Sequence, residues 1–142
     1  MQESTECGCA AAESIKPPRA RRLILCIDDE TEIARILQIR LSRYGIDVAS
    51  ASNGQDGFAA AVKMSPDLVL LDLCMPGDNG EKVLARLRHD PQTSAIPVFL
   101  LTGANASTRR GRWSHYRPDA YLIKPLNFDE LKECICAQFA EK

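Results

Sequence analysis

The fold is indicated most clearly by the stretch Leu68-Val69-Leu70-Leu71-Asp72, in which four consecutive apolar residues lead directly into an acid. A strand with one face in water alternates apolar and polar residues, whereas a strand covered on both faces is apolar throughout. The stretch is therefore typical of a central strand in a parallel sheet that has helices on both sides.

Four further strands are expected around this one, each a short apolar run between longer segments of helical period. Their ranges are Leu23–Ile27, Ile46–Ala51, Pro97–Leu101 and Ala120–Ile123. Four of the expected helices have an apolar face, formed in turn by Ile33, Leu37, Leu41 and Tyr44, by Phe58, Val62 and Met64, by Val83, Leu84 and Leu87, and by Phe128, Leu131, Ile135 and Phe139. A fifth, short helix is expected over Ala104–Ser114. Gly45 suits a helix C-cap and Asn127 a helix N-cap. The pattern predicts an α/β, flavodoxin-like, doubly wound five-stranded parallel sheet in the order 2-1-3-4-5 with five helices.

Residues 1–20 differ in composition from the rest and are expected to form a flexible tail. They are rich in small and polar residues, and Pro17-Pro18 disfavours a helix. Residues 21–142 are then expected to form one domain. Only Glu141 and Lys142 follow the last predicted helix, so we expect no output domain.

The composition argues against several classes of function. A formal net charge of -1 argues against direct binding to DNA, which needs an excess of Lys and Arg. No apolar run approaches the roughly 18–20 residues of a membrane helix, so we expect a cytoplasmic protein. The six cysteines form no C-x-x-C pair and are expected to be free thiols, although Cys7 and Cys9 in the tail are also compatible with a metal site.

Polar side chains directly follow four of the five apolar runs. Asp28, Asp29 and Glu30 follow the first run, Asp72 the third, Thr102 the fourth and Lys124 the fifth. In open α/β sheets ligands bind at the carboxyl ends of the strands. Taken alone, Asp28, Asp29 and Asp72 are each better explained as helix caps or turn residues, and Thr102 and Lys124 are compatible with a helix cap and a salt-bridge partner. Their arrival at one edge of the sheet predicts a shared site.

The predicted cluster of acids needs positive charge. Two carboxylates about 4 Å apart repel each other by on the order of 4 kcal/mol at an effective dielectric constant near 20. Lys124 supplies one cation, and a divalent ion that prefers oxygen ligands, Mg²⁺ or Mn²⁺, would supply the rest. The chemistry that suits this set is phosphoryl transfer onto an Asp, with Thr102 donating a hydrogen bond to a phosphoryl oxygen.

Five short motifs together are highly specific. They are Ile27-Asp28-Asp29-Glu30, Ser52-Asn53-Gly54, Leu71-Asp72-Leu73-Cys74-Met75-Pro76 with Gly80, Leu101-Thr102-Gly103 and Tyr121-Leu122-Ile123-Lys124-Pro125. With these motifs the chain resembles the receiver domains of bacterial response regulators. The resemblance implies a stand-alone, chemotaxis-regulator-like receiver of two-component signalling, which is a phosphoacceptor rather than an enzyme.

The resemblance also implies which residues carry phosphorylation. Asp72 would take the phosphoryl group from a sensor histidine kinase or a histidine phosphotransfer protein. Asp28, Asp29 and Asp72 would bind Mg²⁺, directly or through water, together with the main-chain carbonyl of Cys74. Lys124 would contact the phosphoryl group.

The same resemblance implies a switch: Thr102 and Tyr121 would form a switch pair, and the bond between Lys124 and Pro125 would be cis. From the residues themselves, we expect a downstream protein partner to bind the face around Arg109, Arg112, Trp113 and Tyr121. A solvated basic helix with one anchoring Trp explains the arginines and Trp113 at least as well. Cys74 and Gly103 depart from the usual pattern and leave the lifetime of the phosphoryl group open.

Other hypotheses remain open beside the leading one. The chain is also compatible with a receiver-fold interaction module that is never phosphorylated, and with a receiver fragment of a larger signalling protein. A phosphatase of the haloacid dehalogenase type is disfavoured, because Asp28-Asp29-Glu30-Thr31 does not match the D-x-D-x-[TV] pattern of that family.

Overall fold

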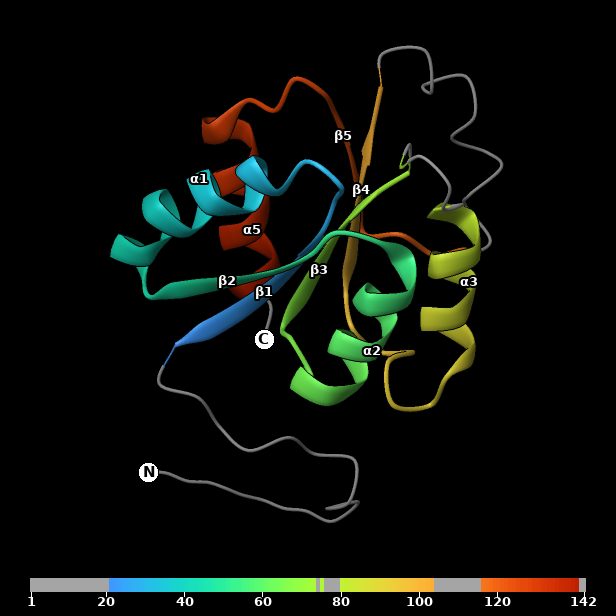
Figure 1. Cartoon of the computed structure of the whole chain (residues 1–142). Helices are drawn as coiled ribbons and strands as arrows, with labels where there is room; N and C mark the ends of the chain where they lie inside the picture. Colours follow the sequence, from blue (N-terminus) through green and yellow to red (C-terminus); the bar gives the residue numbers. More distant parts are fainter. Residues whose placement is uncertain (1–20, 74, 76–79, 104–115, 141–142) are drawn as a thin grey trace, which may run out of the picture.

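Five strands pair in parallel into one sheet, in the predicted order β2-β1-β3-β4-β5 (Figure 1). The computed structural model describes residues 21–73, 75, 80–103 and 116–140. Its strands are β1 (Arg22–Ile27), β2 (Ile46–Ala51), β3 (Leu68–Asp72), β4 (Val98–Thr102) and β5 (Ala120–Ile123). β1 and β3 are neighbours, with Ile27 opposite Leu71, so their carboxyl ends lie at the same level of one sheet edge.

Helices cover both faces of this sheet. The described helices are α1 (Thr31–Leu41), α2 (Gly54–Met64), α3 (Gly80–His89) and α5 (Phe128–Ala140), and a 3₁₀ turn covers Ser42–Tyr44. α1 and α5 lie on one face, and α2 and α3 lie on the other (Figure 1). The α/β class is thereby confirmed, whereas the helix predicted over Ala104–Ser114 lies outside the described residues. Within the described ranges, every helix is too short or too polar to cross a membrane.

Two hydrophobic clusters explain why the central strands are apolar throughout. Every residue of β3 and of β4 is buried. Leu68 and Leu70 belong to the cluster under α1 and α5, whereas Val69 and Leu71 belong to the cluster under α2 and α3. Side chains alternate between the two faces along a strand, and helices cover both faces here, so both sets are apolar.

The ends of the helices follow the prediction with two exceptions, Tyr44 and Met64; Met64, expected on the apolar face of the second helix, is 37% exposed at the end of α2. The Asn127 side chain accepts a hydrogen bond of 3.0 Å from the Glu130 N–H at the start of α5, which confirms this cap. Gly45 has a φ of 78° and ends the 3₁₀ turn after α1, as a C-cap glycine should. The placement of Tyr44 on the apolar face of the first helix is wrong, because its side chain is 48% exposed. α1 ends at Leu41, and the tighter 3₁₀ turn rotates Tyr44 away from the position that α-helical spacing predicts.

α2 approaches β1 closely at Gly57. A Cβ atom at this position would lie 2.6 Å from Ile27 Cδ1 and 2.8 Å from both Ile27 Cγ1 and Cγ2. Ile27 is 0% exposed and directly precedes Asp28, so it has little room to move. The missing side chain at Gly57 therefore sets the distance between the helix and the strand.

Arg88, near the end of α3, anchors the backbone that leads into β5. Its side chain is 8% exposed and forms an ion pair of 3.5 Å with Asp119 Oδ2. The guanidinium donates hydrogen bonds of 2.7–3.2 Å to the main-chain carbonyls of Ser94, Ile96, Tyr116 and Arg117. Asp119 in turn accepts a hydrogen bond of 2.9 Å from the Val98 N–H at the start of β4. A planar cation with several fixed donors is needed to reach acceptors in all these directions.

We expect the Gly57→Ala variant to have a free energy of unfolding about 1–3 kcal/mol below that of the parent. Overpacking against Ile27 should outweigh the gain of about 1 kcal/mol that Ala has over Gly in a helix. Chemical denaturation measures the difference. Gln55→Ala, at an exposed position of α2, is the control and should change stability by less than about 0.5 kcal/mol. Unchanged stability in Gly57→Ala would show that the helix and the strand are not in close contact.

Replacing Arg88 by Lys should lower the free energy of unfolding by about 2–4 kcal/mol. An ammonium cannot reach all four carbonyls, and the carbonyls left without a donor are costly where they are buried. The matched control is Arg86→Lys, because the Arg86 guanidinium lies over the ring of Phe58 at an exposed position. Arg86→Lys should lower the free energy of unfolding by less than about 1 kcal/mol when both variants are unfolded with urea. Equal losses in the two variants would contradict a special role for Arg88.

Candidate functional site

The ends of β1, β3 and β5 bring two acids and one lysine together. Asp28 follows β1, Asp72 is the last residue of β3, and Lys124 follows β5. Lys124 Nζ lies 3.0 Å from Asp28 Oδ2 and 3.2 Å from Asp72 Oδ2. A single ammonium thus bridges two carboxylates that come from neighbouring strands.

Burial sets the electrostatics of this cluster. Asp28 and Asp72 are each 2% exposed, and the side chain of Lys124 is 22% exposed. Burial raises the pKa of the Asp28 carboxyl to about 6, against the opposing effects of the hydrogen bond from the Glu30 N–H and of Lys124. Burial by itself would lower the pKa of Lys124, but the ion pair with Asp28 and the charge of Asp72 outweigh it and raise this pKa. Lys124 is therefore charged at neutral pH.

Asp29 adds a third carboxylate from the exposed side of the cluster. One oxygen each of Asp28, Asp29 and Asp72 lie within 4.8 Å of one another. Asp28 Oδ1 accepts a hydrogen bond of 2.9 Å from the Glu30 N–H, whereas the buried Asp28 Oδ2 lies 3.0 Å from Lys124 Nζ and has no hydrogen-bond partner among the described residues. A buried oxygen that still lacks a hydrogen bond, in a set of oxygen donors only, fits a hard divalent cation.

Thr102 and Tyr121 lie on neighbouring strands and on the same face of the sheet. Leu100 is opposite Tyr121, and Thr102 is two residues beyond Leu100, so the period of two places Thr102 and Tyr121 on one face. Thr102 is 4% exposed, and the half-buried Tyr121 packs against the cluster under α2 and α3. The Lys124 N–H donates a hydrogen bond of 2.7 Å to the Thr102 carbonyl. The peptide bond from Lys124 to Pro125 is cis.

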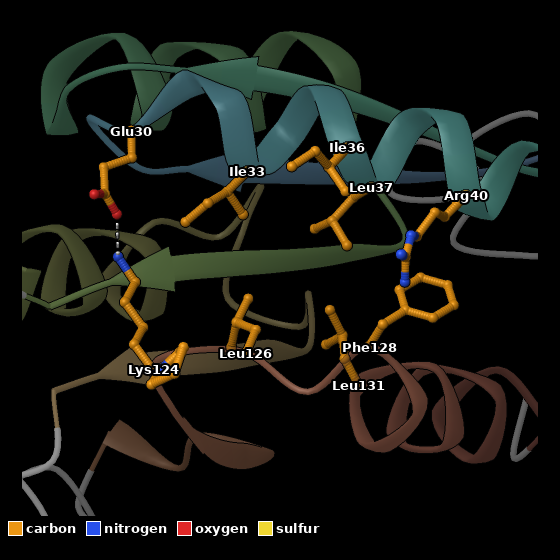
Figure 2. Close-up of a pocket in the computed structure, with 10 residues that line it drawn as sticks. Glu30, Ile33, Ile36, Leu37, Arg40, Lys124, Leu126, Phe128 and Leu131 are labelled. Carbon is orange, nitrogen blue, oxygen red and sulfur yellow. Dashed lines mark hydrogen bonds and ion pairs between the residues drawn. The ribbon is translucent and has the colours of Figure 1, made fainter.

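Glu30, which the sequence pattern placed at this edge without a specific role, also belongs to the site. Lys124 Nζ donates a hydrogen bond of 3.3 Å to Glu30 Oε1 (Figure 2). The run of acids Asp28, Asp29 and Glu30 was the only signal in the sequence. That signal does not say which of the acids reaches the lysine, because this depends on where β5 ends relative to α1.

A groove of about 650 Å³ runs from this ion pair along α1 and the start of α5 (Figure 2). Its apolar lining includes Ile33, Ile36, Leu37, Leu126 and Leu131. At the far end the Arg40 guanidinium lies 4.8 Å from the centroid of the Phe128 ring. The carboxylate cluster therefore adjoins an open, largely apolar surface.

Several predicted residues lie outside the described residues. They are Cys7, Cys9, Cys74, Arg109, Arg112 and Trp113. The described cysteines, Cys26, Cys134 and Cys136, are free thiols as predicted. A Cβ atom at Gly103 would meet no atom of the described residues within 4 Å, so packing against them does not require glycine after Thr102.

Comparison with known families and curated proteins points in one direction. A family described as "Response regulator receiver domain" matches residues 24–136. The chain is 39% identical over 108 residues to the DNA-binding dual master transcriptional regulator RpaA of Synechocystis sp., covering 76% of this chain and 45% of that protein. It is 35% identical over 119 residues to protein PilH of Pseudomonas aeruginosa, covering 84% of this chain and 98% of that protein. The chain thus spans less than half of RpaA but nearly all of PilH.

Solved structures give the same result. The chain is similar to the signal receiver domain of a DNA-binding response regulator from Colwellia psychrerythraea, with a TM-score of 0.75, 31% identity and coverage of 85% of this chain and 99% of that one. The chemotaxis response regulator CheY4 of Vibrio cholerae has a TM-score of 0.75 at 23% identity, with coverage of 83% of this chain and 98% of that one. At this lower identity the likeness concerns the fold alone.

Proposed function

The chain belongs to the response regulator receiver domain family, and we propose that it accepts a phosphoryl group on Asp72 from a sensor histidine kinase or a histidine phosphotransfer protein. Receiver domains are phosphoacceptors of two-component signalling rather than enzymes. The position of Asp72 supports this choice. It is buried at the end of the central strand β3, next to Asp28 and 3.2 Å from Lys124 Nζ.

The transfer needs a nucleophile and charges that stabilise the moving group. An Asp72 oxygen would attack phosphorus in line and form a P–O bond, while the P–N bond to the donor histidine breaks and its electron pair stays on the imidazole. Lys124, which already contacts this carboxylate, would neutralise the phosphoryl oxygens. Thr102, at the end of β4, would donate a hydrogen bond to one of them.

Mg²⁺ is the cofactor that we propose, and Mn²⁺ is an acceptable substitute. Asp28, Asp29 and Asp72, whose oxygens lie within 4.8 Å of one another, would hold it together with the main-chain carbonyl of Cys74. Oxygen-only donors favour these ions over Zn²⁺. A bound divalent cation supplies positive charge to the carboxylates and to the incoming phosphoryl oxygens.

Phosphorylation would be communicated through Thr102 and Tyr121. The phosphoryl group carries about -1.5 to -2 charges at pH 7 in place of the single charge of the Asp72 carboxylate, so a hydroxyl donor nearby is drawn toward it. Thr102 is the nearest such residue on β4, and Tyr121 lies on the same face of the sheet and would follow its movement. A downstream protein partner would then bind the face formed by Tyr121 with Arg109, Arg112 and Trp113.

The mode of signalling that we propose is protein contact in the cytoplasm, without direct binding to DNA. The match to PilH, which extends over 98% of that protein, supports a receiver that works alone. The match to RpaA extends over 45% of that protein and is equally expected of a receiver that forms part of a longer chain. A net charge of -1 favours a protein partner over a nucleic acid.

Incubation with acetyl phosphate and Mg²⁺ should add one phosphoryl group to the parent chain, detected by intact mass. The Asp72→Asn variant should gain none, because an amide is a poor nucleophile. The Asp129→Asn variant removes an exposed acid at the start of α5 and should behave like the parent. Equal uptake by Asp72→Asn and the parent would show that the site is assigned wrongly. Absence of uptake by the parent would favour an interaction module that is never phosphorylated.

Mg²⁺ should raise the thermal unfolding midpoint of the parent. At a concentration about ten times the Kd, binding to the folded state alone stabilises it by about 1.4 kcal/mol. Asp29→Asn should reduce this Mg²⁺-dependent shift to less than about half, because a neutral amide is a weaker ligand. Asp29 is exposed and makes no ion pair with Lys124 in the described part of the chain, so its replacement leaves the buried cluster intact. An equal shift in Asp29→Asn and in the parent would contradict the proposed ligand set.

A further inference from the structure

Lys124 is shared by three carboxylates, and one of them has no part in the transfer described so far. Its Nζ lies 3.0 Å from Asp28, 3.2 Å from Asp72 and 3.3 Å from Glu30. The side chains of Asp28 and Asp72 are 2% and 3% exposed, whereas that of Glu30 is 65% exposed. Figure 2 shows Glu30 extending from the start of α1 toward the lysine, at the end of the groove. The ammonium is therefore attracted both toward the buried carboxylates at the sheet edge and toward the exposed carboxylate of Glu30.

These two attractions have different consequences for the acceptor. Asp28 and Asp72 lie at the ends of β1 and β3, so contact with them keeps Lys124 beside the phosphoacceptor. An ammonium has three donor hydrogens, and three carboxylates already lie within ion-pair distance of this one. A phosphoryl group on Asp72 brings further acceptors, so one existing contact must break. The contact with exposed Glu30 is the weakest and breaks first.

We propose that Glu30 is a positioning residue for phosphoryl transfer: it holds the Lys124 ammonium at the mouth of the site in the resting protein, and it must release the ammonium during transfer. This inference depends on the proposed role of Asp72 and extends it. With acetyl phosphate as donor, an Asp72 oxygen forms the new bond to phosphorus, the bond from phosphorus to the acetyl oxygen breaks, and acetate leaves with the electron pair. Glu30 slows this step, because it competes for the cation that stabilises the developing charge.

The effect should be modest and should depend on salt. Ion pairs between exposed groups are weak, which corresponds to a change in rate of about two- to fivefold. The Debye length falls from about 10 Å at 0.1 M salt to about 3 Å at 1 M, so the effect should shrink as salt is added.

The experiment compares initial rates of phosphoryl uptake from acetyl phosphate and Mg²⁺, followed by intact mass on the full chain. Glu30→Gln removes both the charge and the ion pair. Glu30→Asp keeps the charge and suits the start of a helix, but it is one carbon shorter and should lose the contact with Lys124. Glu32→Gln is the matched control, because it makes the same change of charge at an exposed position in the first turn of α1.

At low salt, Glu30→Gln and Glu30→Asp should both take up the phosphoryl group about two to five times faster than the parent, and Glu32→Gln should match the parent. The difference should narrow at about 0.5 M salt. A parental rate in Glu30→Gln overturns the inference. If Glu30→Gln takes up the phosphoryl group faster than the parent but Glu30→Asp takes it up at the rate of the parent, the inference is also overturned. The negative charge at position 30, or the capping of α1, would then explain the result without the contact to Lys124. If the parent takes up no phosphoryl group, the proposed function fails together with this inference. If the parent and Glu30→Gln take it up at equal rates, only this inference fails.

Discussion

The site depends on one constraint, the burial of two carboxylates at the ends of adjacent central strands. Asp28 and Asp72 are each 2% exposed, and carboxylates removed from water must be paired or must bind a cation. Lys124 contacts both, within 3.0 and 3.2 Å, because β5 runs parallel to β1 and β3 and ends at the same sheet edge. The negative charge that one lysine leaves unbalanced makes this edge receptive to a divalent cation.

The rest of the fold keeps this edge in place. Gly57 allows α2 to lie against Ile27, the residue directly before Asp28. Arg88 fixes the backbone before β5, the strand that ends next to Lys124. Lys124 lies just beyond the end of β5, where a long side chain has room to change partners. A fixed sheet edge beside a lysine that can change partners suits the proposed alternation between a resting and a phosphorylated state.

Local patterns made most of the fold predictable, and particular residues show where such patterns fail. The apolar runs of β3 and β4 predicted strands buried on both faces, and both strands are buried throughout. Tyr44 fits the spacing of a helix that continues past Leu41, but the chain tightens into a 3₁₀ turn there and Tyr44 is exposed. The contact of Glu30 with Lys124 and the anchoring role of Arg88 were not recognised. Their partners lie far away in the chain, and the spacing of nearby residues carries no information about them.

The sequence by itself determined the class of fold and the residues that end each strand. Both follow from short-range features, the period of the apolar residues and the first polar residue after each run. Only the tertiary structure decided that Lys124 lies between Asp28, Asp72 and Glu30, because these distances depend on the register of strands that are far apart in the chain. It also decided the electrostatics of the site. The pKa of Asp28 rises to about 6 because of burial, and burial is a property of the packed sheet and its helices rather than of any segment alone.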